Sequence, residues 1–446
     1  MKTTIPGTFL LALLALLALP DAVMAEHNTE EPAWAGTSKT APAGLLDVAM
    51  TKRQSLFFTE QKVGEKVVPF IGFFIGADGL ALCPLTPLSW KTDLRFGVDD
   101  EGKTRLPPPA VLAVFPEQEL ALVRFAYKPK TWLKLAKEPT PVGTWVAVLS
   151  PSFAPDPVVG PILAHREMTW SLPLVPPRQP VKKFSFAAGR SPSIEMVFVQ
   201  GAPLLDVRGE VVAAFSGSQT LPGQTLRSAS PLAELPERIQ EAVKGKPLEL
   251  PLSAKDLQLD PAVLSEERLA MGETGAAVRR DFANAMQRAK TLVAKFPDSH
   301  YARTEEFGVA ATGAVLGELR ADGLVELAKR FKLEDTDPPW EKGAYYCRLG
   351  EALLGASRAD EAIAPLQKAD ELWPQNMACM SLAIIFDRKG QLDEAERYWK
   401  RATSLDQERI EYWNKLNLIL SARLKFKEAS EASDHARFLE ALYRSH

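Results

Sequence analysis

The order of apolar and polar residues divides the chain into two parts with different periods. Between about Gly44 and Val243, short apolar runs alternate with glycine, proline and aspartate. Such runs predict β-strands in an antiparallel barrel or sandwich. From about Pro261 to the end, apolar residues recur every three or four positions among Ala, Leu, Glu, Lys and Arg, which predicts helices. The chain is therefore expected to be a β half followed by a helical half.

Six runs of the β half are predicted as strands: 67–75, 110–115, 120–125, 144–149, 196–199 and 211–215. Eight prolines fall between Pro151 and Pro180, so we expect that stretch to be mostly loop or sheet edge. Residues 244–262 are predicted as a linker between the halves, because prolines interrupt them and no period is sustained.

The first residues have the pattern of a secretory signal. Lys2 precedes an apolar run over Phe9–Leu19, and Val23 and Ala25 supply small residues at a cleavage site. We therefore predict a signal peptide over 1–25 and a periplasmic or secreted protein. The apolar run is too short to span a bilayer as a helix, and no other stretch is long enough, so no membrane span is expected in the mature chain. An uncleaved N-terminal anchor is the alternative.

Composition excludes several classes of protein. Hydrophobic residues make up 46% and charged residues 24%, which is typical of a folded chain. The net charge of −3 argues against nucleic-acid binding. Three cysteines cannot build a disulfide scaffold or a four-cysteine zinc module, and Cys83 is expected to be a small buried hydrophobe. Acidic clusters at 99–101 and 334–337 lack the spacing of a calcium loop, so neither a metal nor a cofactor is predicted.

Three short patterns repeat in the helical half at steps of 33 and 34 residues. They are Leu349-Gly350, Leu382-Ala383 and Leu416-Asn417; Glu361-Ala362, Glu394-Ala395 and Glu428-Ala429; and Ala369, Ala402 and Ala436. This resembles the tetratricopeptide repeat. The resemblance implies an α-helical repeat solenoid over 343–446, preceded by degenerate helical repeats over 263–342 with helices near 304–317 and 323–331. A plain helical bundle is the alternative.

Such arrays bind peptides or protein segments on their concave face, which is what the resemblance implies here. In this phase the face would carry Cys347, Glu351, Met380, Ile384, Asp387, Arg388, Asn414, Leu418 and Ser421. We predict protein-binding residues among Glu351, Met380, Ile384, Asp387, Arg388, Asn414 and Leu418. For any one of them, packing between helices is an equally good interpretation.

Four segments of the β half together resemble a trypsin-type, HtrA-like serine protease. The first is Gly72–Leu88, where a strand, an Asp-Gly turn and a second strand lead to the position of the catalytic histidine. The others are Glu119–Phe125, Val142–Leu149 and Gly201–Phe215, in the family's order and spacing. The resemblance implies a trypsin-like double β-barrel over 44–243.

The catalytic triad positions of that family are substituted in this chain. The histidine position holds Thr86, the aspartate position Glu119 and the serine position Gln200. Threonine cannot act as a base near neutral pH, and glutamine is not a nucleophile. Ala202 replaces a loop glycine, and its Cβ is expected to distort the oxyanion turn.

His165 is the one histidine between residues 44 and 243, and it lies in the segment where the family has a structural strand. We therefore predict no catalytic residues. The expected function is a non-catalytic binding or scaffold protein whose partners are other proteins or extended peptide segments. A divergent serine endopeptidase with residual or non-standard activity is the alternative.

Overall fold

The structure of the chain is a computed structural model. It describes residues 41–63, 66–88, 94–98, 104–149, 157–168, 181–187, 199–221, 224–249, 252–253, 255–256, 260–266, 268, 274–331, 333 and 337–444. The predicted signal peptide, the acidic cluster at 99–101 and most of the strand predicted at 196–199 lie outside these residues.

The first seven strands form one antiparallel sheet in the order β5-β4-β1-β2-β3-β7-β6. Their bounds are β1 Leu56–Val63, β2 Lys66–Phe74, β3 Leu80–Pro84, β4 Leu94–Gly97, β5 Arg105–Leu106, β6 Ala110–Phe115 and β7 Leu120–Arg124. Phe57, Phe74 and Phe96 surround Phe125 in its core, with ring centroids 4.9 to 5.9 Å from that ring. Among the described strands this sheet remains an open half-barrel.

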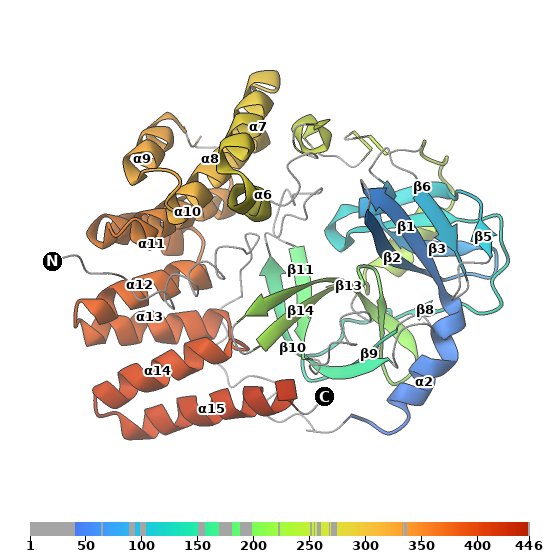
Figure 1. The fold of residues 1–446 in the computed structure, drawn as a ribbon. Coiled ribbons are helices and arrows are strands. Elements are labelled where there is room, and N and C mark those ends of the chain that lie inside the picture. Colours follow the sequence, from blue (N-terminus) through green and yellow to red (C-terminus); the bar gives the residue numbers. More distant parts are fainter. Residues whose placement is uncertain are drawn as a thin grey trace.

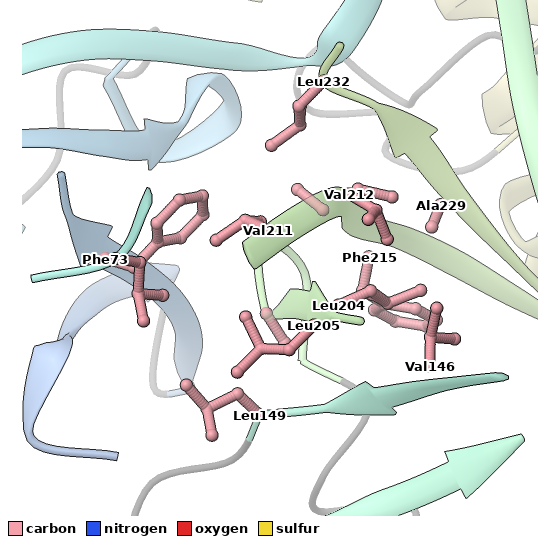
Figure 2. Packing of buried hydrophobic residues seen from close by; sticks show 14 of the residues in the cluster. Phe73, Val146, Leu149, Leu204, Leu205, Val211, Val212, Phe215, Ala229 and Leu232 are labelled. Carbon is pink, nitrogen blue, oxygen red and sulfur yellow. The ribbon is translucent and has the colours of Figure 1, made fainter. Parts of the chain in front are cut away.

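The second sheet closes on itself. Its order is β12-β9-β10-β11-β14-β13-β8, and an additional pairing of β12 with β13 joins six strands into a barrel. The bounds are β8 Lys134–Leu135, β9 Trp145–Val148, β10 Val158–Met168, β11 Val181–Phe186, β12 Pro203–Leu205, β13 Glu210–Leu221 and β14 Gln224–Pro231. Figure 2 shows Leu204, Val212 and Phe215 in its core, with Phe73 of β2 lying beside Val211. A single hydrophobic cluster thus joins the two sheets.

Three short helices complete the β half: α2 Leu45–Lys52, α3 Leu85–Leu88 and α4 Leu235–Ala242. The predicted linker is attached to the first sheet, because the backbone of Leu248 donates to the Val111 carbonyl at 2.7 Å and that of Leu252 donates to the Leu88 carbonyl at 3.2 Å. The linker therefore packs along the β half rather than standing free.

The C-terminal half is all helical over its described residues, and Figure 1 shows its last helices stacked beside one another. The helices are α6 Thr274–Arg280, α7 Phe282–Lys295, α8 His300–Val315, α9 Ala321–Arg330, α10 Pro339–Gly355, α11 Ala359–Leu372, α12 Asn376–Arg388, α13 Leu392–Leu405, α14 Ile410–Ala422 and α15 Phe426–Arg444. Helices α10 to α15 form three successive pairs, whose first helices begin 37 and 34 residues apart (339, 376 and 410). Gly350 allows α10 to approach α11, because a Cβ there would lie 2.4 Å from the Cγ of Leu366.

The helical half contacts the β half at both of its ends. Val263 and Tyr301 pack with the core of the first sheet. At the other end, Leu439 and Tyr443 of α15 pack with Leu163 of β10. Within the described residues no helix is long and apolar enough to cross a membrane.

The predicted fold class is therefore confirmed, as a trypsin-like arrangement of two successive β-sheets followed by helices. The helices predicted near 304–317 and 323–331 are α8 and α9. The prediction of mostly loop between Pro151 and Pro180 is wrong for the described part, because β10 runs through it as an interior strand. Pro161 has no backbone N–H to donate, but its carbonyl still takes part in the sheet because it accepts from the backbone N–H of Ala187 at 3.1 Å. The three cysteines are free and buried, as predicted for Cys83.

Candidate functional site

The three triad positions lie close together at the junction of the two sheets. Thr86 is in α3, directly after β3, and the backbone of Leu85 donates to the Glu119 carbonyl at 2.9 Å. Gln200 reaches the same place from the second sheet, because its carbonyl accepts from the backbone of Ile71 at 3.0 Å. The neighbouring Gly201 lies against Pro84, where an added Cβ would be 2.3 Å from the proline Cγ. The fold therefore brings Thr86, Glu119 and Gln200 together, as the resemblance implied for the three positions.

A buried ion pair occupies this place. The Nζ of Lys183 in β11 donates to Glu119 Oε1 at 2.7 Å and to Ser230 Oγ at 2.6 Å. The exposed fraction of the side chain is 0% for Lys183 and 7% for Glu119, and Ser230 is also fully buried. A charge of either sign buried in this way is stable only while its partner is present. The carboxylate in the aspartate position is thus already paired with a cation.

The backbone of Glu119 is held in an uncommon conformation to make this contact. Its φ is 61°, in the left-handed region that residues with a Cβ seldom adopt. Its N–H donates to the Pro116 carbonyl at 3.1 Å, and its carbonyl accepts from Leu85. These two bonds fix the turn after the 3₁₀ helix Pro116–Gln118, and the turn aims the carboxylate at Lys183.

Lys183 was not identified from the sequence, although the sequence holds a signal for it. The strand Val181-Lys-Lys-Phe-Ser-Phe186 has two adjacent lysines, and successive side chains of a strand point to opposite faces. If one face of this strand is exposed and the other is covered, one of the two lysines must therefore point toward the covered face. The structure exposes Lys182 and buries Lys183.

The side chains in the triad positions do not form a proton relay. Within the described part of the chain, Thr86 Oγ1, Glu119 Oε2 and Gln200 Nε2 are each buried without a hydrogen-bond partner. A relay for acyl transfer needs a nucleophile bonded to a base, and the base bonded to a third group. The ordered contacts here run instead from Glu119 through Lys183 to Ser230.

His165 lies away from this cluster. Its ring stacks on Phe184 with the centroids 4.7 Å apart, and it pairs with Phe184 across β10 and β11. Lys183, the adjacent residue, therefore faces the other side of the sheet. No described histidine is thus placed to act on the triad positions, since His300 is in α8 and His435 in α15.

The expectation that Ala202 distorts its turn is wrong. The left-handed residue of this turn is Gly201, with a φ of 91°, whereas Ala202 has no positive φ. The backbone of Ala202 donates to the Val199 carbonyl at 3.0 Å, and its carbonyl accepts from Phe215 at 2.8 Å. Its Cβ is fully buried in the hydrophobic cluster. The turn therefore accommodates alanine because the conformation that requires glycine is one residue earlier.

The residues predicted to bind protein partners all lie on the first helix of a pair, in α10, α12 or α14. Asp387, Arg388, Asn414 and Leu418 are exposed, and Leu418 has 60% of its surface exposed. Glu351 and Ile384 are partly buried, and burial raises the pKa of Glu351 to about 7 against the opposing effect of Arg348. Met380 is 1% exposed and packs in the core between helices, so it is not available to a partner.

One cluster in the helical half has the residue types of a metal site. His300 at the start of α8 lies with its Nε2 2.5 Å from Glu341 Oε1 and its Nδ1 3.9 Å from Asp337 Oδ1. A single ion would need one nitrogen together with both carboxylates, whereas here each nitrogen faces a different carboxylate. We therefore interpret the cluster as an ion pair that ties α8 to α10.

This ion pair predicts an unusual dependence of stability on pH. Hydrogen bonding to Glu341, opposed by burial and helped by the charge of Asp337, raises the pKa of His300. A raised pKa contributes stability that is complete below the unfolded value of about 6.5 and is lost as the pH rises through the folded value. In thermal unfolding, the free energy of unfolding of wild type should exceed that of His300→Gln by about 1 kcal/mol near pH 6. The difference should be smaller at pH 8 and above.

The matched control is His435→Gln. Burial, only partly offset by a backbone hydrogen bond at Gln407, lowers the pKa of His435 to about 4. Its contribution is therefore present above about pH 6.5 and is lost on acidification. Opposite slopes for the two variants are expected. If the stability difference between wild type and His300→Gln grew as the pH rises, the interpretation of this cluster as an ion pair would be wrong.

Comparisons with known protein families and curated sequences show no family for this chain. No protein-family model matches the chain, and no curated protein sequence matches it. Among solved structures, the active form of the Rv3671c protease from M. tuberculosis is similar at 17% identity, over 50% of this chain and 96% of that one, with a TM-score of 0.39. Deg5 is similar at 14% identity, over 45% of this chain and 95% of that one, with a TM-score of 0.33. The fold assignment rests on the strand pairing itself.

Proposed function

We propose that this chain is a non-catalytic protein-binding or scaffold protein that acts outside the cytoplasm. The observation that carries the proposal is the buried Lys183–Glu119 ion pair at the junction where a protease of this fold would hold its triad. Thr86 cannot replace a histidine as a base there, and Gln200 cannot replace a serine as a nucleophile. The barrel scaffold does not depend on catalytic side chains, so it can persist as a binding domain.

The helical half supplies the second part of the proposal. We interpret its three helix pairs as tetratricopeptide repeats, because the 33- and 34-residue sequence period extends through them. Three large apolar side chains are exposed on α14, on the start of α15 and in the turn between these helices: Leu418 at 60%, Leu424 at 74% and Phe426 at 67%. Exposed apolar groups of this kind favour contact with another protein segment. The predicted secretory signal supports a location in the periplasm or the medium.

A hydrolase is the competing function, and one contact favours it. Ser230 Oγ lies 2.6 Å from the Lys183 amine, and a lysine can activate a serine nucleophile. Both residues are fully buried, however, so a substrate carbonyl has no direct access to the oxygen.

The two functions are separated by treating the full chain with fluorescein-labelled unfolded casein and, in parallel, with a fluorophosphonate probe. We expect the anisotropy of the casein to rise, with no fragments on a gel and no labelled serine. Leu418→Asp should weaken the binding about threefold or more, because it places a charge in an apolar contact. Gln391→Asp, at an exposed position in the turn between α12 and α13, should leave the casein affinity within about twofold of wild type.

Cleavage or labelling that disappears in Ser230→Ala would establish the hydrolase instead. Absence of any casein binding would remove the support for a peptide-binding role.

A further inference from the structure

The segment between the two sheets presents a row of cations and one tryptophan on a single face. Lys128, Lys130, Trp132 and Lys134 are exposed, whereas Pro129 and Leu133 between them are buried. This alternation is that of an extended chain. The backbone of Leu133 donates to Phe74 of the first sheet at 2.9 Å, and that of Ala136 donates to Val211 of the second at 2.9 Å. The row is therefore held by hydrogen bonds to both sheets.

Two adjoining hollows lie along this row; Lys134 of β8 lines both of them, and Lys52 of α2 lines the smaller one. The larger has a volume of about 610 Å³ and the smaller of about 410 Å³. Both are lined by Trp132, Lys134, Arg208 and Glu210; Lys137 and Glu138 belong to the larger alone, and Lys52 and Lys130 to the smaller alone. These volumes are within the range of ligand sites, about 300 to 1,000 Å³.

Arg208 near the hollows is paired with carboxylates, while the lysines are not. Arg208 contacts Asp206 at 2.8 Å and Glu210 at 3.2 Å. Among the described residues, Lys52, Lys130, Lys134 and Lys137 form no ion pair with a carboxylate. The hollows therefore have an uncompensated positive potential, which attracts anions.

We propose that these hollows bind an acidic segment of a partner protein, in which acidic residues stand on both sides of an apolar or aromatic residue. Trp132 forms a wall common to both hollows, so it would pack against the central apolar side chain. Lys52 and Lys130 on one side of it, and Lys137 on the other, would then meet the flanking carboxylates. Lys134 borders both hollows and would contact either side.

The nature of the lining favours a peptide over other anions. Four of the five cations are lysines, whose ammonium groups are point charges, whereas dense phosphate is usually gripped by arginine forks. The surface is hollowed, and a bilayer would meet it only at its rim. This site is separate from the triad positions and from the helix pairs, so it does not depend on the proposed function.

The test is fluorescence anisotropy of a fluorescein-labelled Gly-Glu-Glu-Phe-Glu-Glu-Gly peptide with the full chain. We expect binding that weakens between 50 and 300 mM salt, as screening requires, and that is lost when the glutamates are replaced by glutamines. Lys130→Glu combined with Lys134→Glu should weaken the affinity about tenfold or more. Trp132→Ala should weaken it about threefold.

The matched control is Lys290→Glu combined with Lys415→Glu, the same charge change at exposed positions of α7 and α14, which should leave the affinity within about twofold. Vesicles of phosphatidylglycerol and inorganic polyphosphate are tested in parallel. The proposal is overturned if the Lys130/Lys134 variant binds the peptide as tightly as wild type does. It is also overturned if vesicles or polyphosphate depend on these lysines and the peptide does not bind.

Discussion

Replacing Lys183 with methionine is expected to destabilise the β half by about 3 to 5 kcal/mol, because the substitution leaves the Glu119 carboxylate buried without its cation. The ammonium is fully buried and makes both of its contacts, at 2.7 and 2.6 Å, inside the junction of the two sheets. The measurement is urea unfolding followed by a probe of the β half, since a chain of two halves need not unfold in one transition.

The matched control for this prediction is the adjacent residue. Lys182→Met removes the same charge from the exposed face of the same strand, and it should change the free energy of unfolding by less than about 0.5 kcal/mol. Combining Lys183→Met with Glu119→Leu should recover most of the loss, because it removes both charges together. A single Lys183→Met variant as stable as wild type would show that the pair does not hold the junction.

Gly201→Ala is expected to cost about 3 kcal/mol or more in the stability of the β half. Gly201 has a φ of 91°, and a Cβ there would lie 2.1 Å from the Ile71 carbonyl oxygen. Backbone strain and a clash with main chain therefore add, and β2 cannot move aside without breaking its own pairing. The measurement is the thermal unfolding of the barrel transition.

Gly317→Ala separates strain from clash. Gly317 also has a positive φ, of 78°, but nothing lies within 4 Å of its added Cβ, so only about 1 kcal/mol is expected. Equal costs at the two positions would mean that the close approach of Gly201 to Ile71 and Pro84 is not a constraint. If Gly201→Ala causes a large loss of stability, Gly201 is needed for the packing of the two sheets, whether or not the chain is an enzyme.

The division into a β half and a helical half was predictable because it depends on local periods. Strands β2, β6, β7, β9 and β13 fall on predicted apolar runs, and α8 and α9 fall on predicted helices. The resemblance implied a strand at His165, but the residue pattern missed β10 because prolines count against strands, whereas Pro161 uses only its carbonyl in the pairing. Met380 was placed on a binding face by its position in the repeat, but packing against the neighbouring helices buries it.

The candidate site was predictable only in part. The motifs in the chain singled out Thr86, Glu119 and Gln200, and they showed that residue 86 is not a histidine and residue 200 is not a serine. Lys183 is 64 residues from Glu119 and 47 from Ser230. No local pattern reports a contact over such separations, because the pairing of strands decides which side chains meet.

By itself, the sequence determined the two kinds of secondary structure, the repeat period and the residue types at positions 86, 119 and 200, since each of these depends on residues at short spacing. Only the tertiary structure decided that a buried lysine pairs with the glutamate in the triad region. It also decided that the linker packs on the first sheet and that lysines from separate segments surround Trp132. These features depend on which distant segments the closed barrel and the stacked helices bring into contact, and burial then determines how much each contact matters.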